Sequence, residues 1–116
     1  MWATALVATG FSYQPDTRRH QGEVLTALLP RLRDIRRMGG AATDFVSVAT
    51  GRVDAYYERG LNPWDAAAGK VIAREAGAIV TDLDGEETDG RFVIAAGPKL
   101  YPLLRDALLD AGATSQ

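Results

Sequence analysis

Short apolar runs alternate along the whole chain with longer segments whose apolar residues recur at helical spacing, and this alternation limits the fold more than any other feature. Runs rich in branched and aromatic residues predict strands, and glycines close most of the helical segments. The expected strands are 3–8, 34–38, 53–58, 78–81 and 92–96, and the expected helices are 16–33, 41–50, 63–76 and 99–111. Such an order predicts an α/β fold, a mainly parallel or mixed β-sheet flanked by helices.

Two prolines and the chain length refine this expectation. Pro30 lies inside the 16–33 segment and predicts a kink or an early end of that helix. Asn62 and Pro63 predict a helix start, because asparagine is a good N-cap residue and proline is favoured at the first helical position. In the 41–50 helix we expect Ala42, Phe45, Val46 and Ala49 to share the buried face. At 116 residues the chain has the length of one domain, 1–116, with no linker.

Composition and charge exclude several classes of function. The formal net charge of −2 provides no basic field for nucleic acid and no polybasic patch for a membrane surface. The chain has no cysteine and a single histidine, so any metal would be a hard cation such as magnesium, held by oxygen atoms. No window predicts a membrane span or a signal peptide, and we expect a cytoplasmic protein. The apolar run at the very start suggests an internal piece of something longer.

Asp65 is the first candidate for chemistry. It lies in the first turn of the 63–76 helix, where the helix dipole and unpaired amides favour a carboxylate in any protein. The residues that follow are small, Ala66 to Gly69, so the helix start can pack tightly or admit a ligand to its amides. A helix N-terminus attracts phosphate, and a carboxylate beside it makes sense if a cation lies between the two. At this point Asp65 can be explained either as a carboxylate that stabilises the helix start or as a ligand of a cation.

Other candidates adjoin the same region. Glu58 ends the 53–58 strand and could point into a cleft at the carboxyl edge of the sheet, where α/β proteins tend to bind ligands; a solvated strand end is the simpler explanation. Gly39, Gly40 and Ala41 form a strand-to-helix turn without bulky side chains, open to backbone contact with a ligand. The segment from Asp82 to Gly85 contains two carboxylates spaced closely enough to hold a divalent cation. Because Asp and Gly are also ordinary turn residues, we interpret it as part of an acidic surface loop. We interpret His20 as lying at a solvated helix start.

One stretch of the chain resembles a known family. The sequence NPWDAAAGKVIAREAGA, residues 62–78, closely resembles the C-terminal signature of the inositol monophosphatase family: Trp-Asp, a run of small residues and Glu-Ala-Gly. The preceding DIRRMGGAATDFVSVATGRVDAYYERG continues the likeness, and ALVATGFSY and VIAAGPKLYPLLRDAL resemble its flanks. The resemblance covers nearly the whole chain and implies the C-terminal domain of the inositol-monophosphatase-like sugar phosphatase fold.

The resemblance also implies an activity. Members of the family are magnesium-dependent phosphatases with two or three cations, usually homodimers, inhibited by lithium. It implies that Asp65 is a metal ligand, that Glu58 contacts a hydroxyl of inositol or sugar, and that Gly39, Gly40 and Ala41 line the substrate pocket. The expected substrate is an inositol phosphate or a related sugar phosphate. One small departure is Gly77-Ala78, where the family often has Gly-Gly.

A larger departure bears on activity. The N-terminal half of the family supplies a metal-binding glutamate and an Asp-Pro-Ile-Asp-Gly-Thr motif, and this sequence contains neither. Metal-assisted hydrolysis needs cations on both the attacking water and the leaving oxygen. We therefore expect the C-terminal half of a phosphatase, close to inactive without its missing N-terminal half, and assign no catalytic residue. The alternative is a non-catalytic α/β interaction module or a phosphatase remnant.

Overall fold

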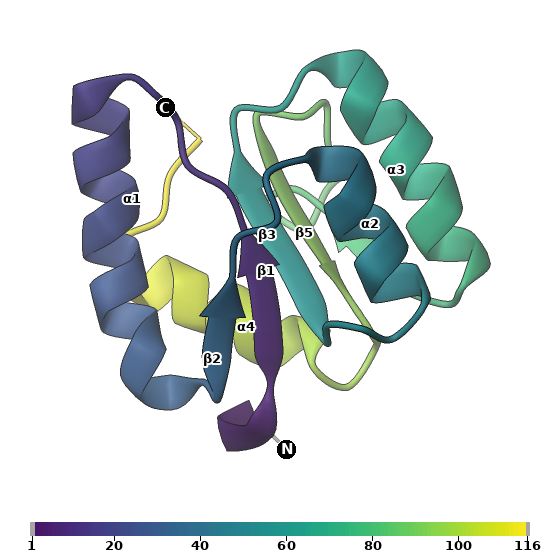
Figure 1. The fold of residues 1–116 in the computed structure, drawn as a ribbon, viewed down its shortest axis with the longest axis horizontal. Helices are drawn as coiled ribbons and strands as arrows, with labels where there is room; N and C mark the ends of the chain where they lie inside the picture. Colours follow the sequence, from purple (N-terminus) through teal and green to yellow (C-terminus); the bar gives the residue numbers. More distant parts are fainter. Residues whose placement is uncertain (1, 116) are drawn as a thin grey trace.

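The five strands form one mixed sheet. The computed structural model describes residues 2–115, and its strands occur in the spatial order β2-β1-β3-β5-β4 (Figure 1). β1, β2 and β3 run parallel, whereas β5 is antiparallel to both of its neighbours. The strands are β1 Leu6–Thr9, β2 Asp34–Arg36, β3 Ala55–Arg59, β4 Ile79–Thr81 and β5 Phe92–Ala96. The predicted α/β class with a mixed sheet is confirmed.

Helices cover both faces of this sheet. In Figure 1, α2 and α3 lie together on one side of the molecule, and α1 and α4 lie on the other. The helices are α1 Pro15–Leu28, α2 Ala41–Ala49, α3 Pro63–Glu75 and α4 Tyr101–Asp110, with 3-10 turns at Trp2–Thr4 and Leu29–Arg31. The expected early end of the first helix is confirmed, because α1 stops before Pro30 and continues as a 3-10 turn.

Side chains on the two faces of the sheet build two separate cores. Successive residues of a strand point to opposite faces, so Tyr57 packs with α1 and α4 while Tyr56 packs with α2 and α3. On the α2–α3 side, the ring of Phe45 meets that of Tyr56 edge-on, with 5.1 Å between their centroids. Burial on both sides explains why β5, Phe92–Ala96, is apolar throughout rather than alternating.

The expected burial of α2 is wrong by one residue. Phe45 is buried as predicted, but Val46 and Ala42 are exposed, and Ala41 and Val48 pack inward instead. The first strand also begins at Leu6 rather than at residue 3, because Trp2–Thr4 forms a 3-10 turn.

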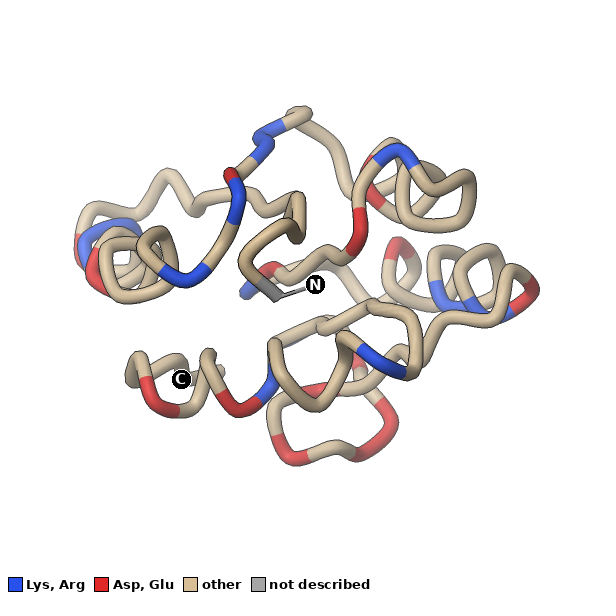
Figure 2. The backbone as a smooth tube through the Cα atoms, turned by 90° about the horizontal axis from the view of Figure 1, so that it is seen from below, with Lys and Arg blue, Asp and Glu red and all other residues tan. Residues whose placement is uncertain are grey.

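Two findings concern the surface. Basic and acidic residues are interspersed over the described part of the chain (Figure 2), consistent with the small net charge of −2. Among residues 2–115, none of the helices has the length and apolar character needed to cross a bilayer.

Candidate functional site

The candidate site is a cleft of about 210 Å³ at the carboxyl edge of the parallel strands. Segments that follow β1, β2 and β3 meet there with the N-terminal ends of α2 and α3. Ligands of open α/β sheets commonly bind at this edge. The cleft is lined by Gly10, Phe11, Tyr13, Arg37, Gly39, Gly40, Ala41, Asp44, Glu58, Leu61 and Asp65.

All of the residues proposed from the sequence line this one cleft. Asp65 comes from the first turn of α3, Glu58 from β3, and Gly39, Gly40 and Ala41 from the turn that opens α2. In the sequence they are spread between positions 39 and 65. The fold therefore gathers them, while their roles toward metal and substrate stay predictions.

Glu58 is held in a fixed position. The hydroxyl of Tyr56, two residues earlier on the same face of β3, donates a hydrogen bond of 2.7 Å to Glu58 Oε1. Burial raises the pKa of Glu58, and the hydrogen bond from Tyr56 and the charge of Arg37 lower it. The simple solvated strand end is thus not what the structure shows. The carboxylate is half-buried and keeps acceptor capacity for a ligand hydroxyl.

Gly10 explains how β1 approaches this carboxylate. A Cβ atom placed on Gly10 would lie 2.6 Å from Glu58 Oε1 and 2.8 Å from Oε2, closer than real Cβ contacts. A glycine after β1 therefore gives the Glu58 carboxylate room within the cleft.

Asp44 is the site residue that sequence reasoning missed. It is only 1% exposed, although it lines the cleft, and its Oδ1 has no hydrogen-bond partner within residues 2–115. Burial and the nearby charge of Glu58 raise its pKa to about 7, whereas Arg37 lowers it. The available signal was its place on the inner side of α2, three residues after Ala41 and four before Val48. An acidic residue on an otherwise apolar helix face indicates a site.

The start of α3 presents Asp65 to the cleft. Pro63 occupies the first turn as expected, but Asn62 at the N-cap position makes no side-chain capping hydrogen bond. The small residues of α3 have a packing role: a Cβ atom on Gly69 would lie 2.0 Å from the Phe45 ring of α2. The two helices therefore pack closely, and Asp65 is left exposed at the rim.

Comparison with known proteins identifies the family of this chain. The sequence profile of the inositol monophosphatase family matches residues 2–112. Inositol-1-monophosphatase SuhB of Mycobacterium tuberculosis is 46% identical over 105 residues, which are 90% of this chain and 36% of that protein. Nus factor SuhB of Xylella fastidiosa is 47% identical over 112 residues, which are 96% of this chain and 40% of that protein. The chain belongs to the inositol monophosphatase family.

Solved structures of the inositol monophosphatase family share the fold. The structure of M. tuberculosis SuhB superposes with a TM-score of 0.84 at 44% identity, over 95% of this chain and 43% of that one. The IMPase of Thermotoga maritima gives a TM-score of 0.82 at 30% identity, over 95% of this chain and 42% of that one. The chain thus spans less than half the length of these relatives.

The metal that the family implies can be tested against the donor atoms of the cleft. Carboxylate oxygens suit magnesium, and Asp65 offers an exposed pair of them. Within residues 2–115, however, no three acidic or histidine side chains lie close enough to hold a metal ion together. The donors therefore fit magnesium in kind but form only part of a coordination shell.

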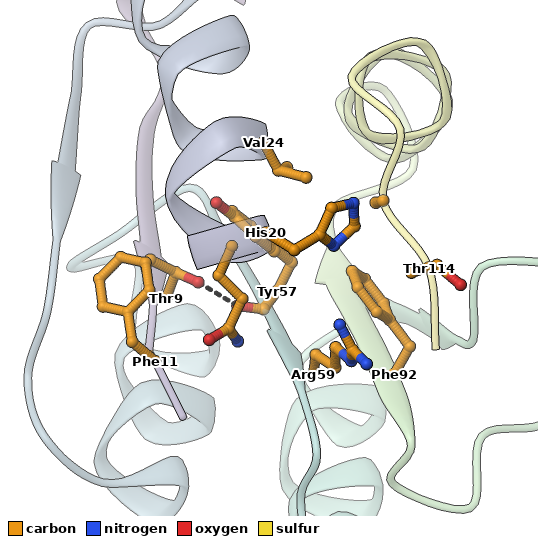
Figure 3. Close-up of a pocket in the computed structure, with 11 residues that line it drawn as sticks. Thr9, Phe11, His20, Val24, Tyr57, Arg59, Phe92 and Thr114 are labelled. Atoms are coloured by element: carbon orange, nitrogen blue, oxygen red, sulfur yellow. Dashed lines mark hydrogen bonds between the residues drawn. The ribbon is translucent and has the colours of Figure 1, made fainter. Parts of the chain in front are cut away.

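A second cavity lies on the opposite face of the sheet (Figure 3). It measures about 20 Å³, which is room for about one water molecule. His20 is half-buried and lines this cavity, so its expected place at a solvated helix start is wrong. The Tyr57 hydroxyl is buried without a hydrogen-bond partner in the described residues, and burial raises its pKa to about 12. This space is too small for a phosphate ester.

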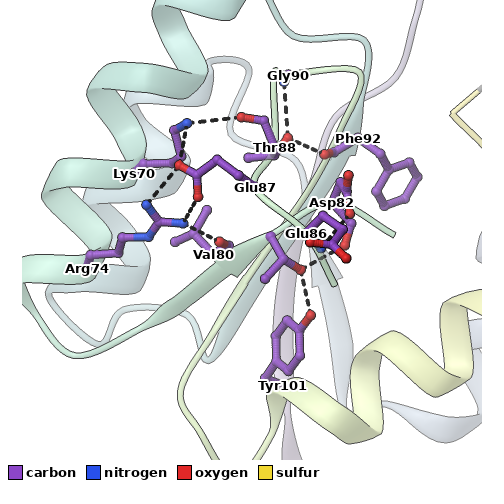
Figure 4. A network of polar contacts seen from close by, with 11 residues as sticks. Lys70, Arg74, Val80, Asp82, Glu86, Glu87, Thr88, Gly90, Phe92 and Tyr101 are labelled. Carbon is purple, nitrogen blue, oxygen red and sulfur yellow. Dashed lines mark hydrogen bonds and ion pairs between the residues drawn. The ribbon is translucent and has the colours of Figure 1, made fainter. Parts of the chain in front are cut away.

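The acidic loop after β4 has a structural role (Figure 4). Asp82 Oδ1 accepts hydrogen bonds of 2.9 Å from the backbone amides of Asp84 and Glu86, as in a turn. Glu87 accepts hydrogen bonds from Arg74 at 2.6 Å and Lys70 at 3.0 Å, which lower its pKa to about 2. The loop is tied to α3, and its interpretation as turn residues rather than a cation site agrees with these contacts.

Proposed function

We propose that this chain is the C-terminal part of a magnesium-dependent phosphomonoesterase that hydrolyses an inositol phosphate or a related sugar phosphate. The observation that carries the proposal is the single cleft shared by Asp65, Glu58 and the Gly39–Ala41 turn. Family membership supports the hydrolase class. The homodimer of the complete enzyme and its cytoplasmic location stay predictions from the resemblance and the sequence.

Each wall of the cleft has a distinct task in this proposal. Asp65 would hold magnesium, which when bound polarises phosphoryl oxygens. The first amides of α2, after Gly40, have no partner within the helix, and its positive end favours the phosphate. Glu58, fixed by Tyr56, accepts a hydrogen bond from a hydroxyl of the inositol or sugar and so orients the alcohol.

The chain alone is expected to be close to inactive. Magnesium-assisted hydrolysis of a phosphate ester needs cations at both the attacking and the leaving oxygen, and the protein must supply oxygen ligands that would hold those cations. Within residues 2–115 the cleft has three carboxyl groups: an exposed one on Asp65, a half-buried one on Glu58 and a buried one on Asp44. The remaining ligands are assigned to the missing N-terminal half.

An activity assay tests this proposal. The chain is assayed with magnesium and inositol phosphate, alone and co-expressed with the segment of M. tuberculosis SuhB that it does not span. We expect turnover only from the combination, and a loss of at least about 100-fold with Asp65→Asn. Glu58→Gln, which keeps the shape of the side chain, serves as a comparison that raises KM. Robust turnover by the chain alone would contradict the proposal that it holds only part of the active site.

A non-catalytic interaction module is the second candidate, favoured by the exposed side chains of Trp64 and Val71 on α3. Isothermal titration with magnesium and inorganic phosphate separates the two, with Asp65→Ala as the matched variant. Heat of magnesium or phosphate binding that is present in the unmodified chain and absent in Asp65→Ala supports the phosphatase function. Indifference of both proteins to both ligands supports the module.

A further inference from the structure

One buried polar group of the candidate cleft has no task in the function proposed above. The side chain of Asp44 is 1% exposed and lines the cleft, and its Oδ1 has no hydrogen-bond partner within residues 2–115. The only other such atom in this part of the chain is the hydroxyl oxygen of Tyr57, on the opposite face of the sheet. Because a buried polar atom without a partner costs free energy, Asp44 is poorly explained as a residue that stabilises the fold.

Buried polar side chains outside the cleft are paired. Ser47 lies on the same helix as Asp44 and is 3% exposed, and its hydroxyl donates a hydrogen bond of 3.4 Å to Met38 Sδ. Thr9 and Thr88 are also buried, and each donates its hydroxyl to a backbone carbonyl. The fold therefore satisfies these polar groups, and leaves the carboxyl group of Asp44 with unused acceptor capacity where a ligand would bind.

Glu58 lies near Asp44 in the same cleft. Its charge contributes to the raised pKa of Asp44, so the two carboxyl groups are close enough to interact. The hydroxyl of Tyr56 donates to Oε1 of Glu58, and Oε2 keeps its acceptor capacity. Arg37, which also lines the cleft, lowers the pKa of both carboxyl groups. The cleft thus offers two carboxyl groups near each other, each with an oxygen available to a ligand.

The chemistry of these two groups favours a ligand with several hydroxyl groups. Within residues 2–115, no three acidic or histidine side chains lie close enough to hold a metal ion together. A hydroxyl group both donates and accepts hydrogen bonds, so it can pair with a carboxyl group in either protonation state. A polyol carries such groups on adjacent carbon atoms and can meet both side chains at once.

We propose that Asp44 binds a second hydroxyl group of the substrate, beside the one that Glu58 binds, so that the cleft selects phosphate esters of polyols. This inference rests on the proposed function, because the phosphate at the start of α2 fixes where the alcohol lies. A site built to bind a hydroxyl group rejects an analogue without it, since the polar group of the protein then stays unpaired. Asp44 is thereby a specificity-determining residue.

The test compares two ligands by NMR titration of the chain without magnesium: inositol phosphate, and cyclohexyl phosphate, which has the same ring but no free hydroxyl group. We expect the unmodified chain to prefer inositol phosphate by at least about tenfold. Asp44→Leu, which keeps the branched shape, should lose most of this preference and bind cyclohexyl phosphate as before. Asp44→Asn keeps an oxygen acceptor and should stay within about threefold of the unmodified chain. Ser47→Ala, a buried polar residue of α2 that does not line the cleft, is the matched control and should change neither affinity.

Stability separates ligand binding from a structural role. Removal of an unpaired polar group should leave the urea midpoint of Asp44→Leu unchanged or raise it, whereas loss of a structural contact would lower it. The inference is overturned if Asp44→Leu is less stable than the unmodified chain, if the unmodified chain binds the two esters equally or not at all, or if Asp44→Leu and Ser47→Ala bind alike.

Activity distinguishes this inference from the proposed function. In the assembly with the M. tuberculosis SuhB segment, Asp44→Leu should raise KM for inositol phosphate and leave kcat nearly unchanged. If the chain shows the expected ligand preference but the assembly hydrolyses neither ester, the polyol site stands and the proposed function fails. If the assembly hydrolyses inositol phosphate and Asp44→Leu does not change KM, the proposed function stands and the role of Asp44 is wrong.

Discussion

Asp44 and Asp65 are carboxylates of the same cleft, but the protein surrounds them in different ways. Asp65 is exposed at the mouth of α3 and can meet a cation without leaving water entirely. Asp44 is buried beside Phe45, close enough to Glu58 for their charges to oppose each other, and its Oδ1 lacks a partner in the described residues. Such a group is satisfied either by a proton or by a ligand that enters the cleft.

The buried aspartate predicts how stability depends on pH. The pKa of Asp44 in the folded protein, about 7, lies above its ordinary value of 3.8, so the folded state holds this proton more tightly than the unfolded chain does. The resulting stability is present in full below about pH 4 and is lost as pH rises through 7. The raised pKa of Glu58 acts in the same direction, and Arg37 opposes both.

We therefore expect the free energy of unfolding in urea to be higher at pH 5.5 than at pH 8, by more than about 1 kcal/mol, since one pKa unit corresponds to about 1.4 kcal/mol. Asp44→Asn should flatten this difference, because the amide does not titrate there. A variant with the same pH dependence as the unmodified chain would show that Asp44 is not the group responsible.

Among the elements, the contact between α2 and α3 depends on one glycine. Gly69→Ala would place a methyl group 2.0 Å from the Phe45 ring, which also packs edge-on against Tyr56. Overpacking of this kind costs about 1–3 kcal/mol, more than alanine gains in helix propensity. We expect a lower urea midpoint for Gly69→Ala.

Gly22→Ala in α1 is the control for this prediction. A Cβ atom on Gly22 meets nothing within 4 Å, so the substitution should stabilise the protein by about 0.5–1 kcal/mol through helix propensity alone. If both substitutions shift the midpoint in the same direction, the close approach of the two helices is not what fixes Gly69.

The elements also show what the sequence could predict. Pro30, the apolar runs and the Asn62-Pro63 start were enough to place, to within a few residues, the four helices and five strands found in residues 2–115. Phe45 was placed correctly on the buried face of α2, but Ala42 and Val46 were not, because nine residues of mostly small side chains leave the period of this helix ambiguous. Asp44 was missed for the same reason.

The candidate site, like the fold, could be predicted from the sequence only in part. Asp65, Glu58 and the Gly39–Ala41 turn could be placed at one sheet edge, because the carboxyl ends of parallel strands and the following helix starts always meet there. The hydrogen bond from Tyr56 to Glu58 and the space that Gly10 leaves for it depend on side-chain geometry across strands, which spacing along the sequence does not record.

At the scale of the whole molecule, the rise in melting temperature caused by magnesium should show whether a second segment completes the metal site of the cleft. A ligand that binds only the folded state stabilises it by RT ln(1 + [L]/Kd), which is about 1.4 kcal/mol at ten times the dissociation constant. With Asp65 as the one exposed carboxylate of its cleft, the chain alone should bind magnesium weakly and show little rise in melting temperature.

The assembly with the M. tuberculosis SuhB segment should gain a clear, saturable rise in melting temperature with magnesium, because the segment adds oxygen ligands to the open side of the cleft. Asp65→Ala in the assembly is the control, and it should remove most of the rise while lowering the magnesium-free melting temperature by only a few degrees, since a carboxylate in the first turn of a helix contributes about 0.3–1 kcal/mol. Equal magnesium shifts for the chain alone and for the assembly would mean that this cleft binds the cation without help. The division of the site between two segments would then be wrong.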